Sequence, residues 1–174
     1  NQGLLGPRTL LAHSIHATPR EWSVLRETQS RVVHCPSSNG FLGSGLFPLK
    51  TALAQQVGVC VGTDIGAGTS FSMARELVDL YKIQALQQFP LNGEQLLFLA
   101  TQAGADALGL GSERGSFDVG KQADFSVWLP QADPYLKARW SACESELEAL
   151  FLLLVWAHPI TTYIDGKKVA EFGK

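Results

Sequence analysis

The chain has 174 residues, of which 45% are hydrophobic and 17% are charged, and its formal net charge at pH 7 is −2. This balance is typical of one ordinary globular unit, gives no sign of disorder and, with no basic run, argues against a nucleic-acid surface. The longest apolar stretch, Leu150 to Ala157, is far short of the roughly 20 residues that span a bilayer, so no membrane association is expected.

The first residues and the cysteines bear on the compartment. Residues 1–7 have neither a basic start nor a starting Met, so we expect no signal peptide. The three cysteines, Cys35, Cys60 and Cys143, are too few and too scattered for a disulfide framework. Cys35 and Cys60 lie in apolar runs, where buried thiols are common. We therefore expect a reducing, cytoplasmic compartment.

A strand followed by a helix recurs three times in the first half of the chain. Apolar runs at residues 9–13, 31–35 and 59–61 predict buried strands. After the first run, Thr18-Pro19-Arg20-Glu21 predicts a helix start, because it combines a capping box with a proline at the first helical position. Such alternation favours parallel strands with right-handed crossovers and helices that cover the sheet.

The spacing of apolar residues predicts the helices that follow the second and third strands. A loop rich in Pro, Ser, Asn and Gly precedes a helix whose one face would carry Leu46, Leu49, Leu53 and Val57. A longer helix runs through Met73 and Tyr81. A further helix starts at Asn92, with Gln95 three residues on, continues through Ala107 and ends at Gly109.

The last third of the chain changes character. Residues 124–129 alternate between apolar and polar, which is typical of a half-exposed strand. Strand-like residues 160–164 and 168–172 flank Asp165-Gly166, a dipeptide typical of a tight hairpin. A Leu-rich helix is expected between these strands, roughly over residues 134–156. We therefore expect antiparallel strands beside a parallel α/β body.

A carboxylate follows the third strand and is followed in turn by a Gly-rich loop. Asp64 comes directly after the apolar run at 59–61 and Gly62-Thr63, and residues 65–70 are Ile-Gly-Ala-Gly-Thr-Ser. Burying an unpaired carboxylate is costly unless something pairs or coordinates it. Glycines let a ligand or metal approach the backbone. Taken alone, this pattern leaves open whether Asp64 serves a site or only caps the following helix.

Two histidines occupy equivalent places on the preceding strands. His13 and His34 each lie at, or one residue from, the end of a predicted strand, as Asp64 does. In a βα barrel such ends converge on the rim where active sites lie. Imidazoles and a carboxylate suit Zn²⁺ binding and proton transfer at neutral pH. A single histidine at a strand end is commonly only structural, but three such ends in succession favour a site; His16 and His158 are assigned no role.

Nine short segments along the chain together form a recognisable pattern. They are residues 11–16 (LAHSIH), 34–39 (HCPSSN), 41–47 (FLGSGLF), 62–73 (GTDIGAGTSFSM), 99–101 (LAT), 107–110 (ALGL), 115–117 (GSF), 120–124 (GKQAD) and 163–167 (YIDGK). In these segments, which cover nearly the whole chain, the sequence resembles the C-terminal part of guanine deaminases, which belong to the amidohydrolase superfamily of metal-dependent (β/α)₈ barrels. The two long Gly-containing segments are specific to guanine deaminases, whereas Gly-Lys-x-Ala-Asp is shared by many amidohydrolases.

The resemblance implies the organisation of the chain. Residues 1–110 would form barrel strands six to eight with their helices. Residues 111–174 would form the return segment of the small β-sandwich subdomain, with strands in 124–129 and 160–172 and an intervening C-terminal helix. It also implies a homodimer and a cytoplasmic enzyme of purine catabolism.

The resemblance implies roles for particular residues. Asp64 corresponds to the strand-eight aspartate that binds the catalytic zinc and moves a proton, and His13 to the strand-six histidine that contacts the metal-bound water. His34 matches a position without a firm role, where it would only pack. Asn39 and residues 66–69 are candidates for lining the pocket, and no substrate-binding residue is assigned. The reaction would be hydrolytic deamination of guanine to xanthine and ammonia.

The chain lacks two motifs of the family. It has no His-x-His in the strand-one context and no His-x-x-Glu of strand five, which carry the other zinc ligands and a proton-transferring Glu. A catalytic zinc needs about three protein ligands, and the resemblance assigns one of them, Asp64, to this chain. We therefore expect a fragment of a longer enzyme, inactive by itself, with unpaired sheet edges that favour self-association.

Two other hypotheses stay open. Another amidohydrolase, one that deaminates a different purine, a pyrimidine or a triazine, would share the fold and Asp64. The chain could also be a non-catalytic module that binds a partner through its exposed edge. Substrate assays and metal analysis distinguish these hypotheses.

Overall fold

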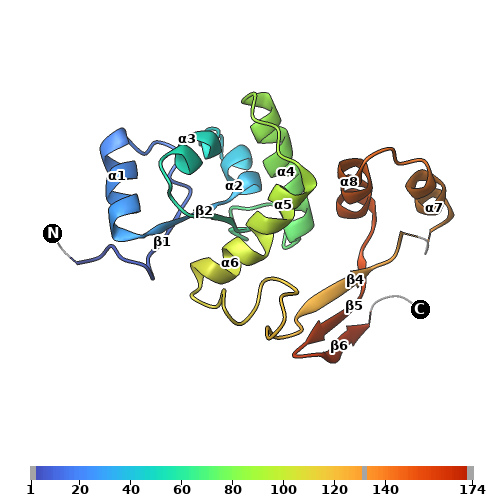
Figure 1. The fold of residues 1–174 in the computed structure, drawn as a ribbon. Coiled ribbons are helices and arrows are strands. Elements are labelled where there is room, and N and C mark those ends of the chain that lie inside the picture. The colour runs from blue at the N-terminus through green and yellow to red at the C-terminus, as the bar shows by residue number, and fades with distance from the viewer. Residues whose placement is uncertain (1–2, 131–132, 172–174) are drawn as a thin grey trace.

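Two three-stranded sheets organise the computed structural model, which describes residues 3–130 and 133–171 (Figure 1). The first sheet is parallel and has the strand order β1-β2-β3, formed by β1 (Leu10–Ala12), β2 (Arg31–His34) and β3 (Val59–Val61). The register pairs Ala12 with Val33 and His34 with Val61. The expected parallel neighbours in chain order are therefore confirmed.

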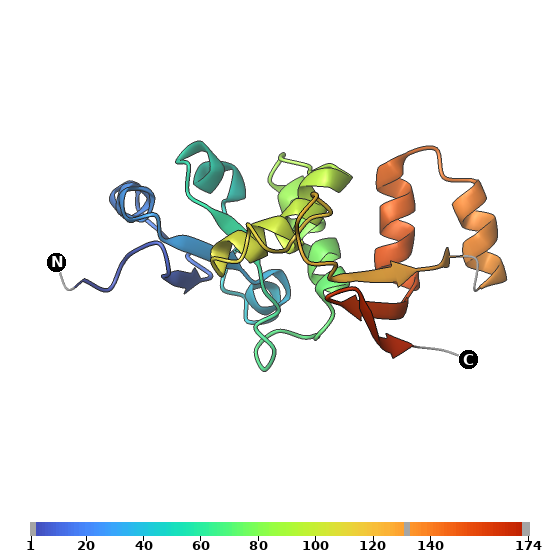
Figure 2. The ribbon, with the colours of Figure 1, turned by 60° about the horizontal axis from the view of Figure 1, so that its bottom comes forward.

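Helices connect and cover these strands. Between β1 and β2 lies α1 (Pro19–Thr28), which begins with the expected capping box at Thr18 and Glu21. Between β2 and β3 lie two short helices, α2 (Pro36–Phe41) and α3 (Leu49–Ala54). After β3 come α4 (Met73–Leu86), α5 (Gly93–Ala100) and α6 (Gln102–Ala107). Figures 1 and 2 show these helices gathered around the first sheet.

The single helix expected over residues 46–57 is wrong. Residues 36–41, expected as a loop, form α2 because Pro36 occupies a first helical position that needs no N–H donor. Helix α3 begins only after Pro48, because a proline disfavours helical geometry in the residue before it. Leu46 and Leu53 are 48% and 43% exposed, so they do not belong to one buried face.

Two other expected helices are each broken in two. Thr101 separates α5 from α6, with φ −122° and ψ −88°, and its hydroxyl donates to the Leu97 carbonyl oxygen at 2.7 Å. Such bonding to the preceding turn bends helices. The Leu-rich stretch forms α7 (Pro134–Ser141) and α8 (Glu146–Trp156), because Ser145 caps a new helix by accepting from the Glu148 amide at 3.2 Å.

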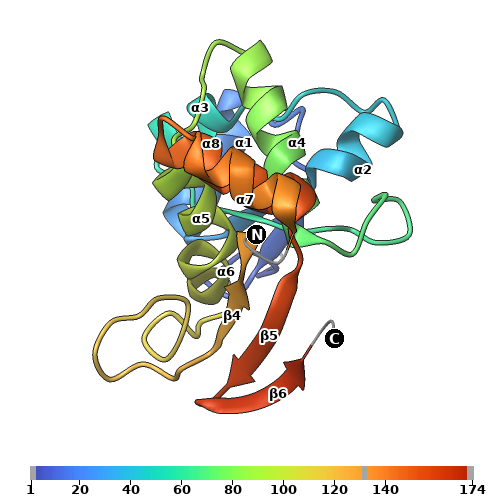
Figure 3. The same cartoon turned by 90° about the vertical axis from the view of Figure 1, so that its right-hand side faces the viewer.

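The second sheet is antiparallel, with the order β4-β5-β6. It consists of β4 (Phe125–Trp128), β5 (Pro159–Ile164) and β6 (Lys167–Glu171). Asp165 and Gly166 have φ of 51° and 70°, which gives the tight turn that the Asp-Gly pair predicts. Figure 3 shows this hairpin extending away from the helices. Phe172, expected in the last strand, lies outside the described residues.

One hydrophobic core joins the first sheet to the helices. Its fully buried members include Val32 on the central strand, Phe47, Leu80 and Leu96. Helix α8 extends this core onto the outer face of α4, where the Tyr81 and Phe151 rings meet edge to face at 4.6 Å between centroids. The described part of the chain contains no helix long and apolar enough to cross a membrane.

Candidate active site

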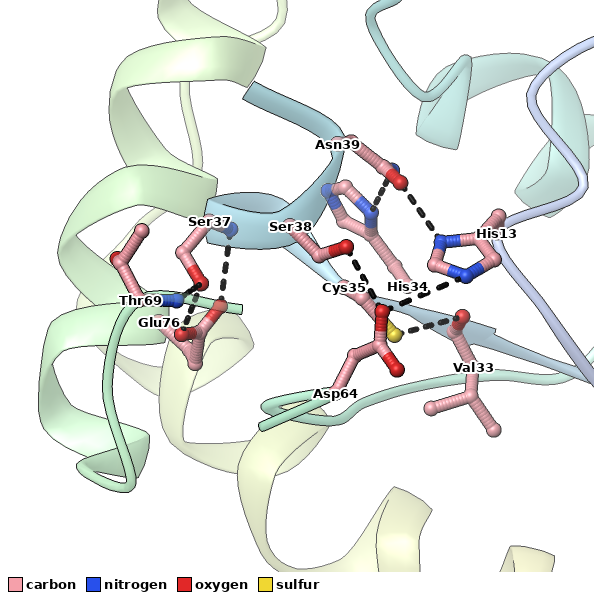
Figure 4. Close-up of polar contacts among 10 residues, drawn as sticks. All are labelled: His13, Val33, His34, Cys35, Ser37, Ser38, Asn39, Asp64, Thr69 and Glu76. Atoms are coloured by element: carbon pink, nitrogen blue, oxygen red, sulfur yellow. Dashed lines mark hydrogen bonds and ion pairs between the residues drawn. The ribbon is translucent and has the colours of Figure 1, made fainter. Parts of the chain in front are cut away.

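The ends of the three parallel strands bring the predicted residues together. His13 follows β1 directly, and Asp64 lies three residues after the end of β3. Their side chains meet across the end of β2, with His13 Nε2 at 3.6 Å from Asp64 Oδ2 (Figure 4). Both side chains are more than a third exposed. The expectation that His13 and Asp64 lie at the same end of the sheet is confirmed.

The backbone at these two residues is unusual. His13 and Asp64 have φ of 65° and 48°, and Ser14 beside His13 has φ of 52°. The left-handed region costs a non-glycine residue roughly 1–2 kcal/mol. Asp and His tolerate it better than most residues, yet such conformations persist only where the surroundings enforce them, and they cluster at functional sites.

The loop after β3 turns back tightly on Asp64. The amides of Ala67 and Gly68 both donate to the Asp64 carbonyl oxygen, at 3.2 and 2.6 Å. A Cβ on Gly68 would overlap the Thr63 carbonyl oxygen, so this position requires glycine. Helix α4 begins only at Met73 and has Ser72 at its cap position. Asp64 therefore does not cap α4, and the interpretation of Asp64 as a simple helix cap is excluded.

Helix α2 supplies a hydrogen bond that orients the Asp64 carboxylate. Ser38, fully buried in α2, donates from its hydroxyl to Asp64 Oδ2 at 2.7 Å. The Oδ1 atom accepts no hydrogen bond from the residues that the structure describes. One oxygen is thus fixed by the protein while the other stays available, an arrangement that suits a carboxylate ligand whose orientation is set by a neighbour.

A buried carboxylate holds α2 in place. The Ser37 amide and hydroxyl donate to Glu76 at 3.0 and 2.6 Å, and the Ser37 hydroxyl accepts from the Thr69 amide at 3.3 Å. Glu76 is fully buried in α4, and burial raises its pKa, an effect that the two Ser37 hydrogen bonds partly offset. Three segments are therefore joined through the Glu76–Ser37 pair: α4 and α2 directly, and the loop that carries Asp64 through the Thr69 amide.

A chain of polar contacts leads from His13 into the core. His13 Nδ1 lies 2.7 Å from Asn39 Oδ1, and Asn39 Nδ2 lies 3.4 Å from His34 Nδ1. The buried His34 ring stacks on Phe47, with 4.6 Å between centroids and 24° between planes. Burial, and to a lesser degree the charge of His13, lowers the pKa of His34 to about 3. His34 is thus held neutral, and it contacts Asn39 as well as packing.

Sequence reasoning missed the roles of Ser37, Ser38 and Glu76. The signal for Glu76 was present, because this charge lies on the apolar face of a helix, three residues from Met73 and four from Leu80. The serines carried no comparable signal. His16 is not drawn into the site: its Nε2 lies 3.1 Å from the Ser44 carbonyl oxygen.

A pocket of about 940 Å³ opens beside the first strand. It reaches the site through His13, and Asp64 does not line it. Its other lining residues are mostly apolar groups of β1, α1 and the segments around them, including Leu11, Ile15 and Val24. Asn39, a candidate for lining a pocket, is 1% exposed and instead contacts the two imidazoles.

The donor set suits part of a metal site. Among the residues that the structure describes, no three His, Cys, Asp or Glu side chains are grouped so that they could hold a metal ion. Asp64, with a free oxygen, fits a single zinc ligand, and a catalytic zinc needs about three from the protein.

Comparison with known proteins places the chain in a family. The model of the amidohydrolase family matches residues 1–169, and the chain belongs to this family. It is 42% identical over 172 residues to the guanine deaminase of Escherichia coli. This alignment covers 97% of the present chain and 39% of the E. coli protein. It is 47% identical over 158 residues to a "Probable guanine deaminase" of Deinococcus radiodurans, covering 87% and 36%. The chain thus spans about two fifths of the length of these relatives.

Solved structures agree with this assignment. The E. coli guanine deaminase superposes with a TM-score of 0.92 at 41% identity, covering 98% of this chain and 41% of that one. A guanine deaminase from C. acetobutylicum with guanine bound in its active site gives 0.84 at 25% identity, covering 97% and 41%. An adenosine deaminase from Xanthomonas campestris with bound zinc gives 0.80 at 29%, covering 95% and 38%.

We predict that His34 makes folding stability depend on pH. Its pKa falls from about 6.5 unfolded to about 3 folded, so the unfolded chain binds more protons between these values. His34 therefore contributes stability that is fully present above about pH 6.5 and is lost as the pH falls toward 3. The slope approaches about 1.4 kcal/mol per pH unit where the difference is one full proton.

The measurement is urea unfolding from pH 8 down to about pH 4, for the wild type and His34→Phe. Phe keeps a ring on Phe47 and cannot be protonated, so the difference between the two proteins isolates this residue from other titrating groups, including Glu76. Identical pH slopes for the two proteins would contradict the prediction.

We also predict that Glu76→Ala destabilises the fold much more than Glu76→Gln. Alanine leaves the buried Ser37 amide and hydroxyl without their acceptor, and each unmet group costs about 1–3 kcal/mol. Glutamine can accept from the amide and donate to the hydroxyl oxygen. Urea unfolding at pH 7 measures both variants, and a Gln variant as unstable as the Ala variant would show that the charge, not the hydrogen bonding, matters.

Proposed function

We propose that this chain is part of a zinc-dependent guanine deaminase, which hydrolyses guanine to xanthine and ammonia. The observation that carries the proposal is the His13–Asp64 pair at the ends of β1 and β3. Similarity to guanine deaminases, one of them solved with guanine bound, supports the substrate. In this proposal residues 1–110 belong to a (β/α)₈ barrel and residues 111–174 to the β-sandwich subdomain.

Asp64 would act as a zinc ligand and as the group that moves a proton. Ser38 holds its Oδ2, which leaves Oδ1 for the metal, and other parts of the enzyme would supply the remaining ligands. Zinc, when bound, lowers the pKa of a water ligand to about 7. The Asp64 carboxylate can take a proton from the attacking water and return it to the departing amino group, a contribution of roughly 10²–10⁴-fold.

His13 would act on the attacking water without being a primary zinc ligand. Its Nε2 faces Asp64 Oδ2 at 3.6 Å, which leaves room for an oxygen atom to contact both groups. From there the imidazole can orient the attacking water through a hydrogen bond. The zinc-containing adenosine deaminase neighbour supports the metal, and it also makes deamination of another purine the second candidate.

The proposal extends to compartment and assembly. The free thiols Cys35, Cys60 and Cys143 support a reducing cytoplasm. A homodimer is part of the proposal, to be measured by sedimentation of the intact enzyme. Assay of that enzyme with guanine, adenine and cytosine tests the reaction; preference for adenine or cytosine would replace guanine as the substrate.

We predict a ranking of three variants of the intact enzyme. Asp64→Asn removes both the metal-binding charge and the proton acceptor at unchanged size, so turnover should fall by several orders of magnitude. His13→Asn should also lower turnover strongly while most of the zinc stays bound. His34→Phe should keep substantial activity. Steady-state kinetics with zinc analysis measure the order, and equal losses from His34→Phe and Asp64→Asn would contradict it.

We predict that this chain by itself holds no tightly bound zinc, because Asp64 lacks imidazole co-ligands here. Elemental analysis after equilibration with zinc and dialysis measures retention, with Asp64→Asn as the control for weak binding. A stoichiometric, tetrahedral zinc on His13, His34 and Asp64 would mean that the chain builds its own site.

A further inference from the structure

Two imidazoles, the exposed His13 and the buried His34, contact the side-chain amide of one buried residue behind the strand ends. Asn39 lies between them, with Oδ1 at 2.7 Å from His13 Nδ1 and Nδ2 at 3.4 Å from His34 Nδ1 (Figure 4). We propose that Asn39 is a positioning residue that holds the proton of His13 on Nδ1 and leaves Nε2 as a hydrogen-bond acceptor facing Asp64.

The proton positions follow from His34, the inner end of the series of contacts from His13 through Asn39 to His34. His34 is fully buried and its pKa is lowered to about 3, so its ring is neutral, with one N–H and one lone pair. The Asn39 amide group donates to His34 Nδ1, and the single proton of His34 therefore sits on Nε2. The ring stacks on Phe47 with its Nδ1 toward Asn39.

The position of the proton on His13, the outer residue of this series, is set by the same Asn39 amide. Asn39 Oδ1 can only accept, so His13 Nδ1 must donate to it, and in the neutral form of the ring Nε2 then presents a lone pair. In a histidine, the hydrogen bond made by one ring nitrogen fixes the state of the other. Asn39 is 1% exposed and lies in α2. Its side chain contacts one imidazole through Oδ1 and the other through Nδ2.

The contact with Asp64 agrees with an acceptor at Nε2. The 3.6 Å between His13 Nε2 and Asp64 Oδ2 is too long for a hydrogen bond, whereas an N–H aimed at a carboxylate would close to about 2.8 Å. Two acceptors face each other across this gap. A water molecule, with two O–H groups, can donate to both of them at once.

This arrangement has a cost. His34 Nε2, which carries the proton, makes no hydrogen bond within the described part of the chain. A reversed amide would leave a lone pair there instead, and would exchange the protons of both rings. The reversed state, with His13 protonated on Nε2 and His34 on Nδ1, is thus the specific alternative that an experiment must exclude.

Neutron diffraction from deuterium-exchanged crystals of the intact enzyme tests the proposal. The crystals are grown at about pH 8.5, about two units above the ordinary histidine pKa of about 6.5. We expect deuterium on His13 Nδ1, on His34 Nε2 and on the Asn39 nitrogen that faces His34. Deuterium on His13 Nε2 with none on Nδ1 would overturn the proposal.

Variants test the consequence for turnover, which rests on the proposed function, whereas the proton positions do not. Asn39→Leu removes the acceptor at similar size, and kcat should fall about tenfold to hundredfold with KM nearly unchanged. Asn39→Asp keeps an acceptor for His13 Nδ1 and should lose less. Asn92→Asp, a matched change at the cap of α5, should change neither constant.

Two outcomes distinguish a failure of the positioning role of Asn39 from a failure of the proposed function. Wild-type kcat in Asn39→Leu would overturn the positioning role, because His13 would then work without its partner. An intact enzyme that does not deaminate guanine would remove the proposed function, while the deuterium positions would still decide where the His13 proton lies.

Discussion

The parallel pairing of three short strands is the constraint on which the rest of the structure depends. Because β1, β2 and β3 run in the same direction and in register, residues far apart in sequence finish at one end of the sheet. His13 and Asp64 reach each other only across the end of β2. The left-handed backbone at both residues shows how sharply the chain must turn there to expose the two side chains.

Behind the two exposed groups lies a layer in which burial and hydrogen bonding set the protonation states. His34 has a lowered pKa and Glu76 a raised one, and burial is the main cause of both shifts. Each buried group contacts a neighbouring side chain of α2, Asn39 for His34 and Ser37 for Glu76. Helix α2 therefore connects the buried layer to the exposed pair, because Asn39 and Ser38 contact His13 and Asp64 directly.

The sequence predicted the three strands and the placement of His13 and Asp64 at one end of the sheet, for a physical reason. Short apolar runs that alternate with helices form parallel neighbours, so polar residues that follow them reach the same edge. The strand ends alone did not separate these two residues from His34; the family resemblance did. Helix boundaries were less predictable, because they depend on single residues. Pro48 delayed one helix start, Thr101 interrupted a continuous apolar pattern, and Ser145 began a new helix inside a Leu-rich run.

The supporting residues were the hardest to predict. Ser37 and Ser38 act through hydrogen bonds to residues 39 and 26 positions away, and local patterns carry no record of such partners. Glu76 was visible as a charge on an apolar helix face, but its partner was not. That His34 Nε2 has no hydrogen-bond partner among the described residues could be found only from the packed structure.

The packing of α8 on α4 also bears on how the protein is made. Tyr81 of α4 meets Phe151 of α8, so the outer face of α4 stays uncovered until residues 146–156 have left the ribosome. Helix α4 carries Glu76, which holds α2 against the loop of Asp64. Strands β1 to β3 are synthesised before α8, so the helix that braces their ends completes its packing only after the strands themselves have been made.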